Sequence, residues 1–188
     1  IHPLQNPRYE PADRIIGRRI LDRKSKVMGV VEDVVLNKNG NIAFLNVVFD
    51  RMQLNRPVFV NYGAYDIRPA SNGYVMAFES GDIKNIYPAM LADIQTAAGG
   101  DDETFSLIKF DGVEVWTESG RKIGAISDVL FNAEGQRAES IYITLTSGPV
   151  NGRGVAVPFA AVNLEKFTTE RRVTVTDQTA DAMIAQAK

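Results

Sequence analysis

The residue types that could carry out catalysis are sparse in this chain. It has no cysteine, which excludes thiol nucleophiles, thiolate metal sites and disulfides. Its one histidine, His2, lies at the N-terminal end of the sequence, where we expect a solvated side chain. Ser25, Ser119 and Ser147 stand in turn contexts, where hydroxyl groups usually bond the backbone. We therefore expect no activated nucleophile.

Carboxylates are the remaining chemical candidates. Asp33 and Asp128 could form a general acid–base pair, but they occupy equivalent places in a repeat, so we expect a structural role for each. The run 101–103 could bind a cation, although consecutive carboxylates in a loop are usually just solvated. The glycine-rich segment 148–154 lacks the Lys-Ser/Thr pair and the helix of a P-loop. We predict no enzymatic activity, no cofactor and no bound metal.

The sequence around Asp33 and Asp128 is repeated at a constant offset of 95 residues. The matched positions are Gly17, Gly29, Asp33, Asn37 and Gly40 with Gly112, Gly124, Asp128, Asn132 and Gly135. Apolar residues between them keep the same spacing, for example Val34 with Val129. A fixed period indicates a duplicated structural unit.

Each repeat has the pattern of five or six short strands followed by one helix. The β-branched runs 27–36 and 122–131 end in the turn signals Asn39-Gly40 and Glu134-Gly135, and a return strand follows each turn. Short strands with closely spaced glycine turns favour a small closed barrel.

Two features refine this prediction. Gly29 and Gly124 fall inside strand patterns, which predicts a bend or a bulge. Segment 85–98 has helical apolar spacing with Pro88 in its first turn, and 177–188 is expected to be a short amphipathic helix capped by Asp177.

These patterns predict a mainly β fold of two small barrels in tandem, each followed by a short α-helix. The predicted boundaries are an extended, proline-containing arm over 1–14, a first unit over 15–98, a linker over 99–105 and a second unit over 106–188.

Charge argues against nucleic acid as a partner. The net charge is −2, although residues 1–60 carry ten Lys or Arg against six Asp or Glu. A basic stretch at residues 14–26 could meet an anionic partner, but Asp13 and Asp22 interrupt it, as on a solvated strand face. No apolar run approaches the roughly 18 to 20 residues that span a bilayer.

The second repeat resembles a PRC-barrel domain, the β-barrel of the photosynthetic reaction centre H subunit and of ribosome maturation factors. The features that carry the resemblance are GRKIGAISDVLFNAEG, the alternating strand around Ile141 to Leu145, a glycine-rich loop and VAVPF ending at Phe159. The first repeat keeps MGVVEDVVLNKNG, but Asn61 stands where the second has Pro158, and DRMQLNRP replaces SGPVNGRG. The resemblance implies an assembly or interaction module that docks on other proteins.

Apolar and arginine residues on loops are the candidate partner-binding residues. They are Arg18, Arg19, Met52, Leu54, Arg56, Pro149, Val150 and Arg153. The alternative is that the loop-tip residues fold back over the barrel ends. Trp116 and Tyr142 are either surface anchors or core-filling aromatics.

The first hypothesis for function is a non-enzymatic interaction subunit of a bacterial complex. Its partners would be other protein subunits or a second copy, with peripheral contact to a membrane complex. The first residue is Ile, which would suit a periplasmic protein after signal-peptide removal; otherwise the chain is cytoplasmic. Two alternatives stay open: a ligand- or metal-binding module using the barrel mouth or the cleft between units, and a ribosome-associated maturation factor.

Overall fold

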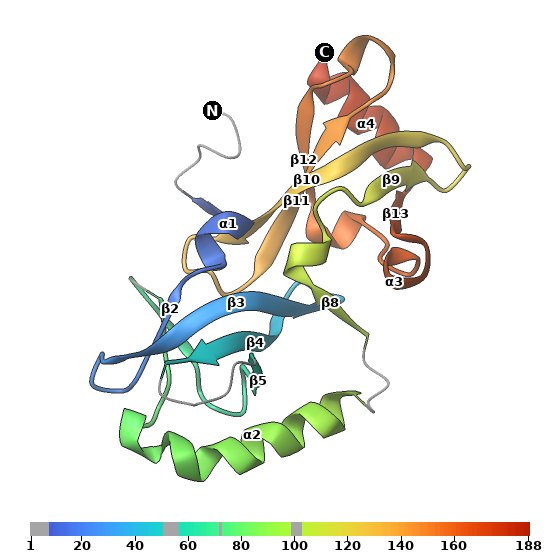
Figure 1. The fold of residues 1–188 in the computed structure, drawn as a ribbon. Coiled ribbons are helices and arrows are strands. Elements are labelled where there is room, and N and C mark those ends of the chain that lie inside the picture. The colour runs from blue at the N-terminus through green and yellow to red at the C-terminus, as the bar shows by residue number, and fades with distance from the viewer. Residues whose placement is uncertain (1–7, 51–56, 72, 99–102) are drawn as a thin grey trace.

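The computed structural model describes residues 8–50, 57–71, 73–98 and 103–188, and for 91–98 it describes the backbone path. Figure 1 shows two β-rich units with a helix on the outside of each. The first unit contains β2 (Arg19–Leu21), β3 (Val27–Asn37), β4 (Ile42–Phe49), β5 (Val58–Asn61), β6 (Arg68–Ala70), β7 (Gly73–Val75), η2 (Ser80–Asp82) and α2 (Ile83–Ala98). The second contains η3 (Leu107–Lys109), β9 (Glu114–Thr117), β10 (Lys122–Asn132), β11 (Ala138–Leu145), η4 (Gly148–Val150), β12 (Gly154–Pro158), η5 (Phe159–Ala161), α3 (Phe167–Glu170), β13 (Arg172–Val175) and α4 (Asp177–Ala187).

The two sheets repeat one topology. The order is β5-β4-β3-β2-β7-β6 in the first and β12-β11-β10-β9-β13 in the second. In both, a short first strand, a long strand and a return strand are antiparallel neighbours, and the first strand also pairs in parallel with a late strand, β7 or β13. The prediction of a mainly β fold whose two units are each followed by a helix is confirmed, and the strands of the two predicted barrels form two sheets.

The units exchange one strand with each other. β1 (Tyr9–Pro11) precedes the first unit but pairs with β10 of the second, and β8 (Thr104–Ser106) precedes the second unit but pairs with β3 of the first. The registers agree at the offset of 95: Tyr9 faces Asn132, and Thr104 faces Asn37. Residues assigned by sequence to the arm and to the linker therefore complete the opposite unit's sheet.

The length of β3 and β10 makes this exchange possible. Each is an 11-residue strand whose first half pairs with β2 or β9 and whose last residues pair with the exchanged strand. Both strands shift register at equivalent places, between Val31 and Asp33 and between Ile126 and Asp128. An irregularity of this kind bends a strand. Each long strand can therefore pair with β2 or β9 along its first half and with the exchanged strand, β8 or β1, at its end.

The two strand glycines permit a close approach of the return strand. A Cβ on Gly29 would lie 2.2 Å from the carbonyl oxygen of Val48, and one on Gly124 would lie 2.4 Å from that of Thr144. Contact at this distance is impossible for a side chain, so glycine is required at both positions.

The helices differ from expectation at their N-terminal ends. η2 leads into α2 at Ile83, so Pro88 lies inside the helix instead of in its first turn. The cap of α4 is Thr176, whose hydroxyl accepts from Thr179 N at 3.0 Å. Asp177, the predicted cap, is the first helical residue, and it accepts from Ser119 Oγ at 2.6 Å. Within the described ranges, no helix has both the length and the apolar character needed to cross a bilayer.

Buried apolar residues of both units form one connected core. The hairpin turns contribute directly to this continuity: Ala138 N donates to Gly40 O at 2.8 Å, and Tyr74 Oη donates to Gly135 O at 2.6 Å. Burial raises the pKa of Tyr74, which keeps its hydroxyl protonated as the donor. The two units therefore pack as one body with two sheets.

Candidate functional site

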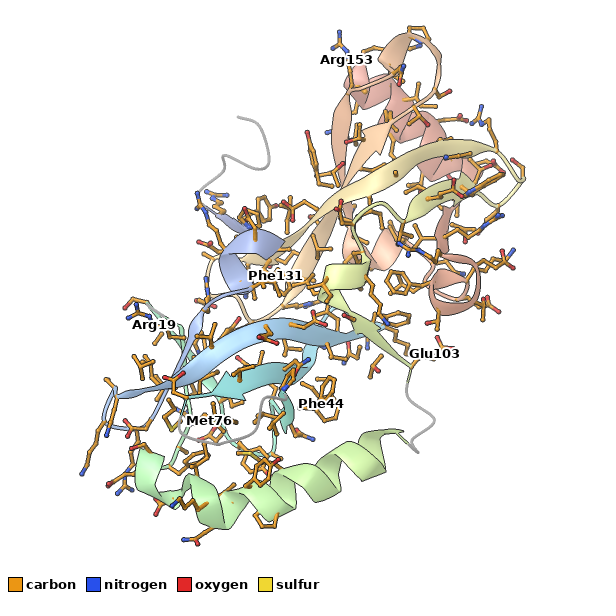
Figure 2. All side chains as sticks on the ribbon, in the orientation of Figure 1. Arg19, Phe44, Met76, Glu103, Phe131 and Arg153 are labelled. Carbon is orange, nitrogen blue, oxygen red and sulfur yellow. The ribbon has the colours of Figure 1, made fainter. Side chains whose placement is uncertain are left out.

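A cavity of about 530 Å³ lies where the units meet, and we call it the inter-unit pocket. The first unit contributes Val35 of β3, Phe44 of β4 and Phe59 of β5. The second side is formed by β8, η3, α3 and the residues that follow them. The exchanged strand β8 is thus one wall of the pocket, and Figure 2 places Phe44 on the side of the first unit that faces Glu103, the residue before β8.

The floor of the pocket is held by packed aromatic rings. Phe167, which lines it, makes an edge-on contact with Phe105 at 5.3 Å between ring centroids and a tilted contact with Phe110 at 4.5 Å. All three rings are buried. Phe44 and Phe59 on the facing wall are half-exposed, so part of the aromatic surface of the pocket is open to solvent.

Asp33 anchors the wall formed by β8. Its carboxylate accepts from Ser106 Oγ, from Ile108 N at 3.2 Å and from Val34 N at 2.8 Å. The carboxylate is buried, and these donors replace the water that it loses. Ser106 lines the pocket, so the same bonds fix part of its lining.

Two exposed cations complete the lining, Lys109 at the end of η3 and Arg171 after α3. Neither forms an ion pair with another described residue. Arg171 has a left-handed backbone, with φ 51° and ψ 43°, at the C-cap of α3. Its carbonyl oxygen accepts from Glu114 N at 3.3 Å, which ties this residue to β9.

Arg18, a predicted partner-binding residue, is instead engaged within the molecule. Its guanidinium donates to Arg14 O at 3.1 Å and to Glu134 O at 3.4 Å, and it lies 3.8 Å from the Glu10 carboxylate. It also lies 5.6 Å from the centre of the Tyr74 ring. Its contacts join the two units, so Arg18 has a role within the molecule, and its role in partner binding stays a prediction.

The other predicted residues do not converge on one surface. Arg19, Pro149 and Arg153 are exposed, but Figure 2 shows Arg19 on the first unit, well separated from Arg153 at the tip of the second. Val150 is only 2% exposed, so it folds back into the core as the alternative interpretation has it. Met52, Leu54 and Arg56 lie outside the described residues.

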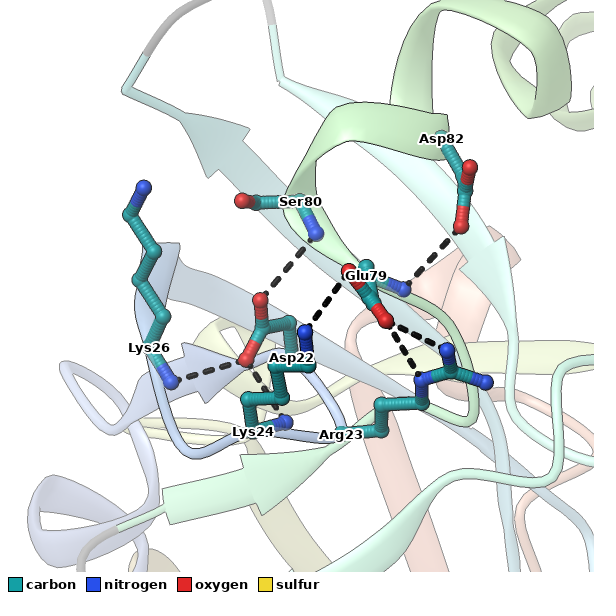
Figure 3. Close-up of polar contacts among 7 residues, drawn as sticks. All are labelled: Asp22, Arg23, Lys24, Lys26, Glu79, Ser80 and Asp82. Carbon is teal, nitrogen blue, oxygen red and sulfur yellow. Dashed lines mark hydrogen bonds and ion pairs between the residues drawn. The ribbon is translucent and has the colours of Figure 1, made fainter.

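Much of the basic stretch is neutralised by neighbouring carboxylates (Figure 3). Glu79 pairs with Arg23 and also with Lys24, at 3.2 Å. Hydrogen bonds from Arg23 and Lys24 lower the pKa of Glu79, which therefore stays ionised. These two cations serve the turn before α2 and are not free for an anionic partner.

Asp22 organises the same turn. It is buried, and it accepts from Lys26 N at 2.8 Å, Lys24 N at 2.9 Å and Ser80 N at 3.1 Å (Figure 3). Burial alone would raise its pKa, but these backbone hydrogen bonds outweigh burial and lower it. The ionised carboxylate thus joins the β2–β3 turn to the start of η2.

Asp33 and Asp128 hold different segments of the chain. Asp128 accepts from Ala12 N at 3.0 Å and Val129 N at 2.8 Å, whereas the donors to Asp33 lie in β8 and η3. Burial raises the pKa of Asp128. Each carboxylate supports the segment that enters from the other unit. Among the described residues, no three His, Cys, Asp or Glu side chains gather as a metal would require.

The two aromatic candidates have different environments. Tyr142 is buried against Gly154, where an added Cβ would lie 1.8 Å from its hydroxyl oxygen. Trp116 is half-buried, and the Arg172 guanidinium lies 4.3 Å from the centre of its ring. Tyr142 therefore fills space, as the core interpretation has it, whereas the ring of Trp116 stacks against the Arg172 guanidinium.

The sequence suggests a cleft between the units as one alternative ligand site, but it identifies none of the lining residues of the inter-unit pocket, because they come from segments far apart in the chain. The offset of 95 contained one usable signal: Thr104 and Ser106 align with Tyr9 and Pro11, although Tyr9 and Pro11 were assigned to the arm, Thr104 to the linker and Ser106 to the start of the second unit. Recognising these segments as equivalent strands would have placed β8 beside β3.

The fold and this arrangement define a two-sheet β protein with a binding-type cavity between its units. Residues 102–183 match the PRC-barrel domain family model. The second part of the chain is therefore a PRC-barrel domain, which indicates a non-catalytic interaction or assembly module. The sequence matches no curated protein.

Proposed function

We propose that the chain is a non-enzymatic assembly subunit built from two PRC-type units, the first a diverged copy of the second. The repeated sheet order and the matched registers of β1 and β8 support this view of the first unit. In this proposal each unit presents its own surface to a protein of a larger complex.

The reciprocal strand exchange is the observation that carries the proposal. A scaffold that holds two partners needs its binding surfaces at a fixed separation. Here each sheet contains a strand from the other half of the chain, and one core runs through both units. The relative position of the two surfaces is then set by main-chain hydrogen bonds as well as by a linker.

The loop between β11 and β12 is an accessible surface of the PRC-barrel domain. Pro149 and Arg153 are exposed there, and Figure 2 shows Arg153 at the end of the molecule farthest from the first unit. The bonds Gly152 N to Leu145 O, at 2.8 Å, and Leu145 N to Arg153 O, at 2.8 Å, hold the loop in place. An ordered, exposed loop bearing an arginine has the character of an interface anchor.

Site-specific photo-crosslinking in cells of the source organism tests the proposal. A photoreactive residue at Pro149 should capture a defined protein reproducibly, and Arg153→Glu should abolish the capture. Lys166→Glu reverses another exposed charge of the same unit and should leave the capture unchanged. A chain that yields no reproducible crosslink, and that is monomeric by light scattering, would contradict an assembly role.

A further inference from the structure

We infer that the inter-unit pocket binds a small amphipathic anion, a carboxylate attached to an aromatic or aliphatic body. This activity goes beyond an assembly role, because the ligand is a small molecule and its site is separate from the β11–β12 loop. Three features of the pocket support the inference: its apolar walls, its uncompensated cations and the backbone of Arg171.

The walls suit an apolar body. Val35, Val113 and Phe167 are buried, while Phe44 and Phe59 are half-exposed and available to a ligand. A volume of about 530 Å³ lies within the roughly 300 to 1,000 Å³ of small-molecule sites, which are mostly apolar with a few polar groups. Packing of Phe167 against Phe105 and Phe110 keeps the floor formed before a ligand enters.

The charges select an anion. Lys109 and Arg171 both line the pocket, and no described carboxylate pairs with either one. Glu170, the neighbour of Arg171, is engaged by Arg172 Nε at 3.3 Å. Glu114, the neighbour of Val113, pairs with Lys122 Nζ at 2.6 Å, and Glu103 and Asp111 are exposed. Two cations above an apolar floor complement a ligand that carries its negative charge at one end.

Arg171 occupies a backbone conformation that favours glycine. A residue that ends a helix in the left-handed region is usually Gly or Asn, because other side chains are strained there. The chain nevertheless has arginine at this position, with φ 51°. A strained backbone that holds a cation at a cavity is the kind of outlier from which a binding role can be inferred.

The equivalent positions on the opposite side of the molecule keep part of this character. Phe44 pairs with Val35, and the equivalent pair in the second sheet is Ser140 with Leu130, so an aromatic wall residue becomes a small polar one. At the offset of 95, Val113 corresponds to Arg18 and Thr104 to Tyr9, while the cation at Lys109 is matched by Arg14. The aromatic and apolar walls of the pocket therefore differ between the two strand exchanges.

Titration of the full-length chain with 2-naphthylacetate and its neutral isostere 2-naphthylacetamide tests the inference. Calorimetry should show saturable binding of one naphthylacetate per chain, about tenfold tighter than the amide, as expected for one charge-assisted hydrogen bond. Amide resonances of Val35, Ser106 and Val113 should shift along the titration. Decanoate should compete with naphthylacetate, because the walls accept an aliphatic body.

Variants of exposed residues separate charge from folding. Lys109→Gln and Arg171→Gln should each weaken naphthylacetate binding about threefold to tenfold and leave the binding of the amide unchanged. Arg171→Gly should weaken binding equally while the melting temperature stays the same or rises, because glycine relieves the left-handed strain. Lys84→Gln removes an exposed cation of α2, which does not line the pocket, and should change neither measurement.

Three results would overturn the inference. One is the absence of saturable binding of both naphthylacetate and decanoate at millimolar concentration. Another is equal affinity for the acid and the amide, since the cations would then play no part. The third is binding of an acidic, apolar peptide at these residues when neither small anion binds, which would assign the pocket to a protein segment.

Discussion

The two units build the same turn from different chemistry. In the first, the buried carboxylate of Asp22 accepts Lys26 N at 2.8 Å; in the second, the hydroxyl of Thr117 stands at the equivalent position and accepts Arg121 N at 3.0 Å. Asp22 also accepts Ser80 N, which links its turn to the helical segment. The two turns share the hydrogen bond from the residue four positions later. The charged acceptor, Asp22, stands in the turn that binds an additional donor, Ser80 N.

The exchanged strands differ more strongly than the turns. Phe105 in the middle of β8 is 2% exposed and packs against Phe167, whereas its counterpart Glu10 in β1 is half-exposed and lies 3.8 Å from Arg18. Ser106 bonds Asp33 through its hydroxyl, but its counterpart Pro11 has no N–H to donate, and Ala12 N reaches Asp128 instead. The comparison teaches that one exchange is an apolar contact and the other a polar one.

Truncation of Phe105 and of its counterpart Glu10 should give the largest difference in stability between the two strand exchanges. Phe105→Ala should lower the free energy of unfolding by about 3–5 kcal/mol, because a buried ring leaves a cavity. Glu10→Ala, at the equivalent position, should cost about 1 kcal/mol or less, since only a partly exposed ion pair is lost. Urea unfolding followed by circular dichroism measures both. Equal losses would show that the exchanges contribute alike.

The turns offer the next largest difference. Asp22→Ala should cost about 2–3 kcal/mol because three backbone donors lose a charged acceptor, and Thr117→Ala about 1 kcal/mol. The lowered pKa of Asp22 means that its contribution is present above its usual value of 3.8 and disappears as the pH falls through the folded-state pKa. Unfolding free energies measured from pH 6 to pH 2.5 should therefore show the Asp22→Ala deficit shrinking in acid, while the Thr117→Ala deficit stays constant.

The paired carboxylates Asp33 and Asp128 should show a smaller contrast. Asp33→Ala should cost about 2 kcal/mol, because it leaves donors from β8 and η3 unpaired, and Asp128→Ala about 1 kcal/mol. Burial raises the pKa of Asp128, so its ionised form opposes folding, and its contribution falls as the pH rises through the folded-state pKa. Asp128→Ala should accordingly remove this loss of stability, which begins as the pH rises above the ordinary value of 3.8. A larger loss for Asp128→Ala than for Asp33→Ala at pH 7 would reverse the comparison.

The smallest effect concerns backbone conformation in the same pair of turns. Ser25 has φ 64°, and its counterpart Gly120 has φ 92° with no atom within 4 Å of an added Cβ. Ser25→Gly should stabilise the protein by up to about 1 kcal/mol, and Gly120→Ser should destabilise it by about the same amount. Thermal melts of both variants measure this. Changes of equal sign would mean that φ does not govern these positions.

The sequence predicted what depends on local periodicity and on the repeat. The long strands, their glycine turns, the two helices and the PRC-type character of the second half follow from β-branched runs and the offset of 95. Helix starts were less accurate: α2 begins ahead of Pro88, and Thr176 caps α4. Packing decides whether a helix can begin ahead of a proline, and it also decides which of two adjacent residues becomes the cap. A local sequence pattern does not contain this information.

The candidate site was far less predictable. β1 and β8 are three residues long and flank proline or acidic segments, so they lack the length from which strand periodicity can be detected. Val150 resembles an exposed loop tip in the sequence, yet the loop is tied to Leu145 at its base and Val150 turns inward. Arg18 has the spacing of a solvated cation, but its guanidinium donates to Glu134 O of the second unit as well as to the nearby Arg14 O. These environments depend on the folded chain and are not visible in the local sequence pattern.

The reciprocal exchange also sets an order on synthesis of the chain. β3 and β4 emerge from the ribosome well before β8, so the first sheet has an unpaired stretch at Val35–Asn37 until translation has passed Ser106. β1 precedes β10 in the chain and stays unpaired until β10 has been made. The first sheet therefore completes its hydrogen bonding only after synthesis of the second unit has begun, and the second sheet uses a strand that was made before either unit.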